Sequence, residues 1–299
     1  MAKANIQELL DNGVHFGHLT RKWNPNMAPY IYTERNGVHI IDLYKTAAKI
    51  EEASLALQKI ANSGRKILFV ATKKQAKDIV SEKAAAVNMP FITERWPGGM
   101  LTNFITIRKA VKKMTSIDRM KQDGSFDALS KREKLQINRQ REKLDKNLGS
   151  IVDMTRLPGA IFVVDVKKEH IAIAEAQKLN IPIFAMVDTN SDPRPVDFVI
   201  PSNDDASKSI EKVLSFITEG IAEGLSDRKA EKEKAKPAEK PAEKTAEEPA
   251  KEPAKEPAAK EAVKKAAKPA KKEVVKEVEV VKEATPVVET TTETTVEKK

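Results

Sequence analysis

The sequence predicts a doubly wound α/β domain with a parallel sheet, an inserted antiparallel helical hairpin and a disordered C-terminal tail. Three observations support this prediction. Between residues 60 and 205, short apolar runs rich in β-branched and aromatic residues alternate with amphipathic stretches, a pattern typical of a parallel sheet covered on both faces. Residues 103–149 interrupt this pattern with two long helical segments. From about residue 228, the chain is almost wholly Ala, Glu, Lys, Pro, Val and Thr, which bury too little apolar surface to fold.

Five apolar runs are the expected strands of the sheet, because near-continuous apolar character is typical of strands that helices bury on both sides. Two helices are indicated by their start signals. Asp42 can cap a helix that runs through Asn62, and Asp205 or a neighbouring residue can cap a helix over residues 206–223. The five expected strands are residues 66–72, 91–95, 160–165, 181–188 and 198–201.

A β-hairpin is expected before the sheet. Asn36 and Gly37 lie between two β-prone runs, and this dipeptide favours a tight turn because both residues tolerate positive φ. Residues 15–25 (HFGHLTRKWNP) come just before the hairpin and are expected to lie on a loop. This loop holds two of the four histidines and one of the two tryptophans, so it is a candidate functional segment.

The insertion at residues 103–149 is expected to form two antiparallel helices that project from the sheet domain. Val111 and Met114 lie on an apolar stripe of the first helix, and Ser130 with Glu133 forms a capping box that starts the second. A charged helix face is usually only solvated, but the density of cations here favours an anionic partner. Thirteen cations contribute: Arg108, Lys109, Lys112, Lys113, Arg119, Lys121, Lys131, Arg132, Lys134, Arg139, Arg141, Lys143 and Lys146.

Composition narrows the class of protein. The formal net charge of +9 favours an anionic partner such as a nucleic acid, although a modest positive charge also serves solubility. The chain has no cysteine, which excludes disulfides and thiolate metal sites. The N-terminus lacks a signal-peptide core and no apolar run approaches a membrane span, so we expect a soluble cytoplasmic protein without a membrane partner.

A metal site is the first chemical hypothesis for the loop at residues 15–25. His15 and His18 would face the same side only in a helix, and Gly17 argues against a helix, so a structural or stacking role is favoured for this pair. Carboxylates at the ends of the last two predicted strands keep the hypothesis open, because α/β sheets gather their sites at that edge. His18 could converge there on a divalent cation with Asp188, Asp204 and Asp205, although turn and capping roles are the usual ones for Asp.

A nucleotide enzyme is the second hypothesis. Gly98 and Gly99 come directly before a predicted helix, where free backbone N–H groups can bind a phosphate. The segment matches neither a Walker loop nor a Gly-x-Gly-x-x-Gly fingerprint, and the chain has no nucleophile elbow, so we expect no enzyme, no small-molecule substrate and no cofactor. The same glycine pair, flanked by Arg95 and Arg108, can instead contact a nucleic-acid phosphate.

A surface for RNA is the third hypothesis, and it accounts for more of the candidate residues than the other two. Arg21 and Lys22 stand beside Trp23 and Asn24, and Arg95 stands beside Trp96. Cations neutralise phosphates, while aromatic rings stack on unpaired bases, which favours RNA loops over duplex DNA. The alternative is that the tryptophans are ordinary core aromatics.

Five ordered blocks resemble the S-two family of bacterial small-subunit ribosomal proteins, and together they cover residues 1–225. The blocks are VHFGHLTRKWNPNMAPYIYTERNGVHIIDLYKT, WPGGMLTNF, LPGAIFVVD, EHIAIAEAQKLNIPIFAMVDTNSDP and VDFVIPSNDDASKSI. The resemblance implies a flavodoxin-like or Rossmann-like domain with a coiled-coil hairpin inserted after the second strand. It also implies a ribosome-associated protein that binds small-subunit ribosomal RNA near the junction of head and body, contacts neighbouring ribosomal proteins and helps to recruit ribosomal protein S-one.

Carried over by position, two motifs of the family are expected to face RNA.

The expected domain boundaries are 1–102 with 150–225 for the α/β platform, 103–149 for the hairpin and 226–299 for the disordered tail. A nucleotide-dependent enzyme and a protein-only coiled-coil scaffold remain the alternatives. The expected RNA-binding residues are Arg21, Lys22, Trp23 and Asn24 of the first motif, Arg95, Gly98, Gly99, Thr102 and Asn103 of the second, and the flanking Arg108.

Overall fold

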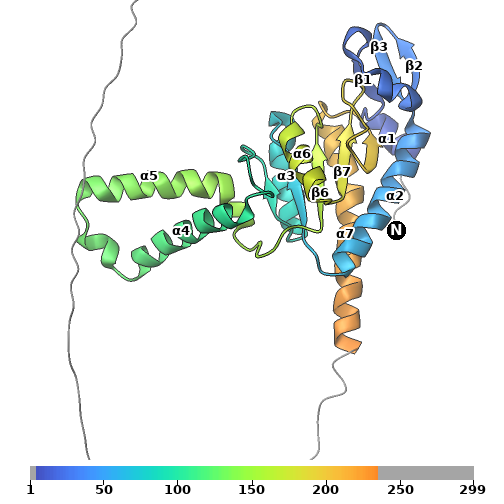
Figure 1. The fold of residues 1–299 in the computed structure, drawn as a ribbon. Coiled ribbons are helices and arrows are strands. Elements are labelled where there is room, and N and C mark those ends of the chain that lie inside the picture. The colour runs from blue at the N-terminus through green and yellow to red at the C-terminus, as the bar shows by residue number, and fades with distance from the viewer. Residues whose placement is uncertain (1–4, 235–299) are drawn as a thin grey trace, which may run out of the picture. The chain divides into compact units, whose positions relative to one another are not determined.

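The computed structural model of the chain describes residues 5–234 (Figure 1), and within them eight strands form two sheets. The smaller sheet is antiparallel, in the order β1-β3-β2. Asn36 and Gly37 join β2 to β3 with φ of 53° and 73°, which confirms the predicted turn. The bounds of the three strands are Phe16–Leu19 for β1, Ile31–Arg35 for β2 and Val38–Ile41 for β3.

The segment at residues 15–25 was expected to be a loop, but most of it forms a strand and two 3₁₀ helices, so this expectation was wrong. Its first part is strand β1, which pairs with β3 through Phe16 opposite Ile40. Two short 3₁₀ helices follow, η1 (Thr20–Lys22) and η2 (Pro25–Tyr30). Pairing with a strand more than 15 residues away has no local signal, which is why the sequence pattern did not reveal it.

The larger sheet has five strands, all paired in parallel, in the order β5-β4-β6-β7-β8. Numbered along the chain from β4, this order is 2-1-3-4-5, which is the flavodoxin-like order of doubly wound sheets. All five predicted strands are present, although the run at 91–95 is strand only over its first two residues. The strands are β4 (Ile67–Val70), β5 (Phe91–Ile92), β6 (Ala160–Val164), β7 (Ile183–Val187) and β8 (Phe198–Pro201).

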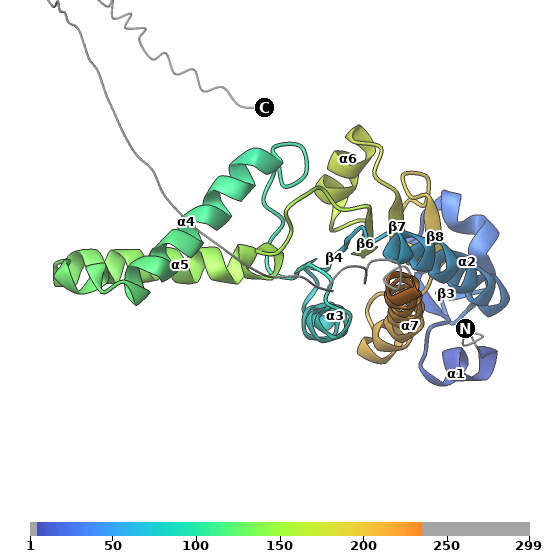
Figure 2. The same ribbon diagram turned by 90° about the horizontal axis from the view of Figure 1, so that it is seen from below.

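Helices cover both faces of this sheet (Figure 2), as the sequence predicted. Alternate residues of each strand enter different cores: Phe69 and Phe162 belong to one apolar cluster, whereas Leu68 and Val163 belong to the other. The first cluster lies under α2, α3 and α7, and the second under α6 and the inner end of the inserted hairpin. The helices are α1 (Ile6–Asp11), α2 (Leu43–Asn62), α3 (Lys74–Ala86), α6 (His170–Lys178) and α7 (Ser207–Lys234).

The predicted helix starts agree with the structure more closely than the predicted ends. The Asp42 side chain accepts the Tyr44 N–H at 3.0 Å, so Asp42 is the N-cap of α2 as expected. At the start of α7, however, the side chain of Asn203 accepts the N–H groups of Asp205 and Ala206, while the Asp205 carboxylate is used elsewhere. Asp205 itself is therefore not shown as the cap.

The final helix α7 is longer than predicted, so residues 226–234, which we had assigned to the tail, are helical. These residues are mainly Ala, Glu, Lys and Arg, which are strong helix formers, and the first proline after them is Pro237. Because they are strongly polar, they lack the apolar periodicity that marks a packed helix. The predicted disordered tail from residue 235 onward lies outside the described residues.

The inserted hairpin consists of α4 (Phe104–Gln122), the short helix η3 (Ser125–Ala128) and α5 (Lys131–Leu148), and it extends away from the sheet (Figure 1). It lies between β5 and β6, as expected. The capping box of Ser130 and Glu133 is present at the start of α5, and Arg141 Nε lies 2.6 Å from Asp118 Oδ1 between the two helices. Coiled-coil packing stays a prediction. None of the helices within residues 5–234 combines the length and apolar character that a membrane crossing requires.

Candidate functional site

Residues 17–24, which include the first motif, are hydrogen-bonded to Thr189, the second residue after strand β7 of the parallel sheet. The Thr189 hydroxyl accepts the His18 N–H at 2.8 Å, and the Thr189 carbonyl accepts the Asn24 N–H at 2.8 Å. Gly17 is needed at this contact, because a Cβ there would lie 2.6 Å from Thr189 Cγ2 and 3.0 Å from the carbonyl oxygen of His39. The motif is therefore held rigidly against the carboxyl edge of the larger sheet.

The four residues of the first motif that were expected to bind RNA differ in their exposure and contacts. Arg21 and Lys22 are exposed, and the Trp23 ring is 38% exposed while its inner side contacts the His39 ring at 5.0 Å between centroids. Asn24 instead has a structural task, because its side chain accepts the Asn26 N–H and caps η2. The exposed Arg21, Lys22 and Trp23, called here the cation–Trp loop, can contact a partner.

In the second motif, several backbone N–H groups near the glycine pair already have a partner within the protein. The N–H groups of Gly99, Leu101 and Thr102 all donate to the carboxylate of Glu175, at 2.8, 2.9 and 3.1 Å. The Trp96 indole N–H and the Thr102 hydroxyl donate to the same carboxylate. The N–H groups of Gly99, Leu101 and Thr102 are therefore engaged by a carboxylate of the protein itself, and RNA binding by Gly98 and Gly99 stays a prediction.

Glu175 was missed by the sequence analysis. It lies on α6, is only 7% exposed and faces the loop from the second core. Burial raises its pKa, but the hydrogen bonds from Thr102, Trp96, Leu101 and Gly99 outweigh burial, so its pKa lies below the usual value. The only sequence signal was a carboxylate in the apolar stretch HIAIAEAQK, where a buried charge requires partners.

The remaining residues of the second motif differ in their exposure. Arg95, Gly98, Thr102 and Asn103 are exposed, and a Cβ at Gly98 would meet nothing within 4 Å. Trp96 is buried, which favours the core role over stacking on a base. Arg108 is half-buried and donates to the Met154 carbonyl at 2.9 Å. Both motifs rest on the same core, because Met27 of η2 and Trp96 belong to one apolar cluster.

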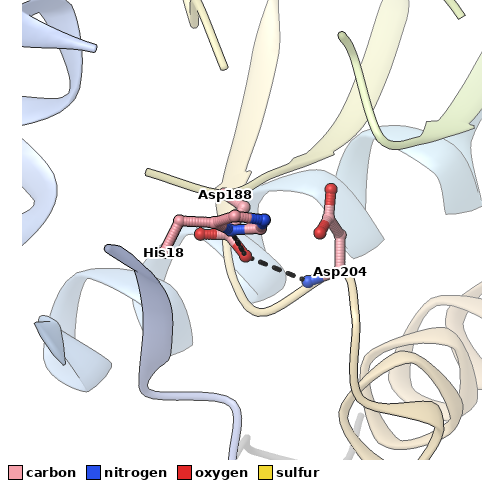
Figure 3. Close-up of side chains that lie close together, drawn as sticks. All are labelled: His18, Asp188 and Asp204. Atoms are coloured by element: carbon pink, nitrogen blue, oxygen red, sulfur yellow. Dashed lines mark hydrogen bonds and ion pairs between the residues drawn. The ribbon is translucent and has the colours of Figure 1, made fainter. Parts of the chain in front are cut away.

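The four residues of the hypothetical metal site lie close together at the carboxyl edge of the larger sheet, and Figure 3 shows three of them, His18, Asp188 and Asp204. His18 Nδ1 lies 3.0 Å from Asp188 Oδ2, and His18 Nε2 lies 3.2 Å from Asp205 Oδ2. Asp204 is fully buried beside them. By contrast, the His15 ring packs against the Phe16 ring in a tilted arrangement, with 4.0 Å between centroids, and His15 is not part of the cluster.

Two further residues of this cluster were missed by the sequence analysis. Lys73 Nζ lies 2.7 Å from Asp204 Oδ1 and 2.6 Å from Asp205 Oδ1, and Asp165 Oδ2 is 3.8 Å from the same ammonium. Lys73 follows β4 and Asp165 follows β6, so both stand at strand ends where such sheets gather sites. That position was the available signal for both residues.

Crowded charge shifts two pKa values in the cluster. Burial, reinforced by the charges of Asp188 and Asp165, raises the pKa of Asp204 to about 7, against the opposing effect of Lys73. The pKa of His18 is also raised, chiefly by its hydrogen bond with Asp188 and by the surrounding carboxylates, although its burial acts in the opposite direction. In all, four carboxyl groups (Asp165, Asp188, Asp204 and Asp205) lie around two basic groups, Lys73 and His18.

The fold and its sites define a class: a flavodoxin-like α/β protein with an inserted basic helical arm. Comparison with known proteins makes the assignment more specific. A family model described as ribosomal protein S2 matches residues 9–224. The chain belongs to the ribosomal protein S2 family, the S-two family that the five sequence blocks resemble. This confirms the predicted family, and it places the protein among the structural components of the small ribosomal subunit rather than among enzymes.

Curated relatives agree with this family assignment. The chain is 77% identical to the small ribosomal subunit protein uS2 of Flavobacterium johnsoniae over 216 residues, which cover 72% of this chain and 85% of the relative. It is 77% identical to that of Flavobacterium psychrophilum over 217 residues, covering 73% and 82%. Identity to that of Parabacteroides distasonis is 67% over 219 residues, covering 73% and 79%.

Proposed function

We propose that this chain binds small-subunit ribosomal RNA near the junction of head and body and supports the recruitment of ribosomal protein S-one. The observation that carries the RNA part is the cation–Trp loop, in which two exposed cations adjoin a partly exposed indole on a rigidly held segment. Family membership supplies the ribosomal setting, and the position on the subunit and the S-one contact follow from the resemblance. A ribosome-bound, cytoplasmic location accompanies this function.

The cation–Trp loop can combine two kinds of RNA contact. Arg21 and Lys22 neutralise backbone phosphates and release counterions, so this contribution weakens as salt rises. Trp23 provides an aromatic face on which an unpaired base can stack. Because the Thr189 contacts fix the backbone of this loop, little conformational entropy is lost when RNA binds.

The inserted hairpin is proposed to act as a second, mainly electrostatic contact. Most of its cations are exposed, whereas Arg108 and Arg141 are engaged with the protein itself. Coiled-coil packing of α4 and α5 would keep this arm straight and hold its charges at fixed spacing along an RNA backbone. The exposed cations are Lys109, Lys112, Lys113, Arg119, Lys121, Lys131, Arg132, Arg139, Lys143 and Lys146.

The second motif keeps a narrower role in this proposal. Arg95, Gly98 and Asn103 present an exposed surface, while Glu175 holds the loop backbone in shape from inside. RNA would therefore contact the outer side of this loop through its side chains and the open surface at Gly98, not through the N–H groups of Gly99 and Thr102.

Sedimentation through sucrose gradients tests the proposal. Tagged full-length chain in a cell lysate should migrate with the small ribosomal subunit and should shift toward the top of the gradient at high salt. Small subunits prepared without this chain should also lose S-one, and adding the chain back should restore it. Migration as a free species at low salt would contradict RNA binding, and retention of S-one on depleted subunits would contradict the recruitment role.

A further inference from the structure

A surface pocket lies where the inner end of α5 meets the loop of the second motif. Its volume is about 280 Å³, near the lower end of the range for small-molecule sites. Arg95 and Pro97 line it from the loop, and five residues between Gln140 and Leu148 line it from α5. These five residues recur every three or four positions, so they share one face of the helix. The pocket therefore exists only because the hairpin packs against the platform.

Both walls of this pocket are held in place by the protein. On the loop side, the carboxylate of Glu175 accepts the N–H groups of Gly99 and Leu101, which fixes the backbone just after Pro97. On the helix side, Leu148 is only 5% exposed, and Leu144 packs against the same apolar cluster. A pocket with rigid walls is already formed before a ligand enters, so binding there loses little conformational entropy.

The lining of the pocket combines an apolar surface with free amides. Pro97, Leu144 and Leu148 provide the apolar part. Gln140 and Asn147 also line the pocket, and neither side chain forms a hydrogen bond with another residue in the described range 5–234. Side-chain amides can both donate to and accept from the edges of a nucleobase, while apolar surface packs against its flat faces. This combination therefore suits an unstacked nucleobase.

The charge around the pocket favours a polyanion. Arg95 and Lys143 line it, are exposed, and form no ion pair with any residue that the structure describes. No lining residue is acidic. The neighbouring Glu94 is already engaged, because its carboxylate lies 3.2 Å from Lys77 Nζ and 3.5 Å from Lys146 Nζ. The two free cations can therefore bind the phosphates on either side of a base in the pocket.

We propose that this pocket binds one unstacked nucleobase from a single-stranded segment of RNA. Gln140 and Asn147 hydrogen-bond to the edge of the base, and Arg95 and Lys143 neutralise the flanking phosphates. This inference rests on the proposed RNA-binding function and extends it. The inserted hairpin then contributes a base contact at its inner end in addition to its electrostatic contact with the RNA backbone.

Filter binding of small-subunit RNA to the full-length chain over a salt series tests the pocket. Gln140→Ala and Asn147→Ala should each weaken binding about 3- to 10-fold, the usual effect of losing a hydrogen bond, and should leave the salt slope unchanged because no charge is removed. Gln136→Ala is the matched control, since Gln136 is exposed one turn farther out on α5 and does not line the pocket. This control should bind within about 2-fold of the original chain.

The outcomes separate this inference from the proposed function. If the original chain does not bind the RNA, the proposed function fails. If the original chain binds but Gln140→Ala and Asn147→Ala bind as tightly as Gln136→Ala, only the pocket is overturned. It is also overturned if both variants bind purified RNA normally but no longer migrate with small subunits, because the occupant is then a protein. Melting temperatures check folding, and the exposed Gln140 keeps the test valid if Asn147→Ala does not fold.

Discussion

At the scale of single residues, the Glu175 side chain holds the loop at residues 96–102 in its conformation. Its carboxylate accepts hydrogen bonds from three backbone N–H groups, one indole N–H and one hydroxyl of this loop. Each hydrogen bond to a buried carboxylate is stronger than a neutral one. The loop therefore depends on a negative charge that belongs to the protein.

Glu175→Gln should destabilise the protein by about 3 kcal/mol, because the amide can accept at only one of the two oxygen positions and presents N–H groups to donors at the other. Urea denaturation of the full chain measures this change. Glu219→Gln, on the exposed side of α7, is the matched control and should change stability by less than about 0.5 kcal/mol. Equal stability of the two variants would contradict the role assigned to Glu175.

The same comparison has a defined pH dependence. The pKa of Glu175 is lowered in the folded state, so its ionised form contributes stability that is complete above the unfolded value of about 4.3. That contribution is lost as pH falls through the folded-state pKa. The stability difference between the original chain and Glu175→Gln should thus be constant at neutral pH and shrink below about pH 4.

Variants of the cation–Trp loop can distinguish the contribution of charge to RNA binding from the contribution of base stacking. Replacing Arg21 and Lys22 together with Ala should reduce the slope of log K against log salt by about 1.5 for small-subunit RNA, because two phosphate contacts are lost. Trp23→Leu should weaken binding by about 1–3 kcal/mol and leave the slope unchanged. Filter binding over a salt series measures both, and an unchanged slope for the double variant would remove these cations from the phosphate contacts.

At the scale of elements, β1 is the connection between the small antiparallel sheet and the larger sheet. Gly17 allows β1 to approach Thr189 closely. Gly17→Ala should therefore force β1 away and cost about 1–3 kcal/mol, the usual cost of overpacking. Gly98→Ala is the matched control, since a methyl group there meets nothing within 4 Å. Denaturation midpoints of both variants test this, and equal midpoints would contradict the tight contact.

A separate prediction concerns the contribution of the hairpin cations to the salt dependence of RNA binding. Replacing Lys121, Lys131, Arg132 and Arg139 with Gln preserves helix propensity but removes four exposed cations. The salt slope for RNA binding should fall by about 3, while the melting temperature stays within about 2 °C. The control removes four exposed lysines elsewhere, Lys59, Lys178, Lys208 and Lys229. If both sets lower the slope equally, the effect is net charge and not the arm.

At the scale of the whole molecule, α7 closes one face of the sheet and extends beyond the core. Leu225 packs against the first apolar cluster, and farther along, Asp227 accepts a hydrogen bond from Gln58 while the Arg228 side chain lies over Gly64. These later contacts are polar and exposed, so their contribution to stability is small. The cooperative unit should therefore end near the last turn that contacts α2.

Two truncations test this boundary. Ending the chain after Lys234 should leave the melting temperature unchanged, whereas ending it after Leu225 should lower it by about 2–4 °C while unfolding stays cooperative. Differential scanning calorimetry of both truncations and the full chain measures the effect. Loss of cooperativity after truncation at Lys234 would show that residues 235–299 belong to the folded unit.

The sequence by itself determined those features whose physical cause is local. Apolar runs placed the five parallel strands, Asp42 and Ser130 placed two helix starts, and Asn36 with Gly37 placed the hairpin turn. In each case the decisive contact joins residues within a few positions of one another. The convergence of His18 with Asp188, Asp204 and Asp205 was also predictable, because parallel strands bring their carboxyl ends to one edge.

Only the tertiary structure decided features that depend on distant partners. Glu175 lies more than 70 residues from the N–H groups it occupies, and without that contact the glycine pair resembled an open phosphate site. Likewise, the sequence did not indicate that Lys73 forms ion pairs with Asp204 and Asp165. Strand β1 forms by pairing with β3, which is also distant in the sequence. Hydrogen bonding and burial are satisfied across the fold, so a local pattern shows which groups need partners but not which residues provide them.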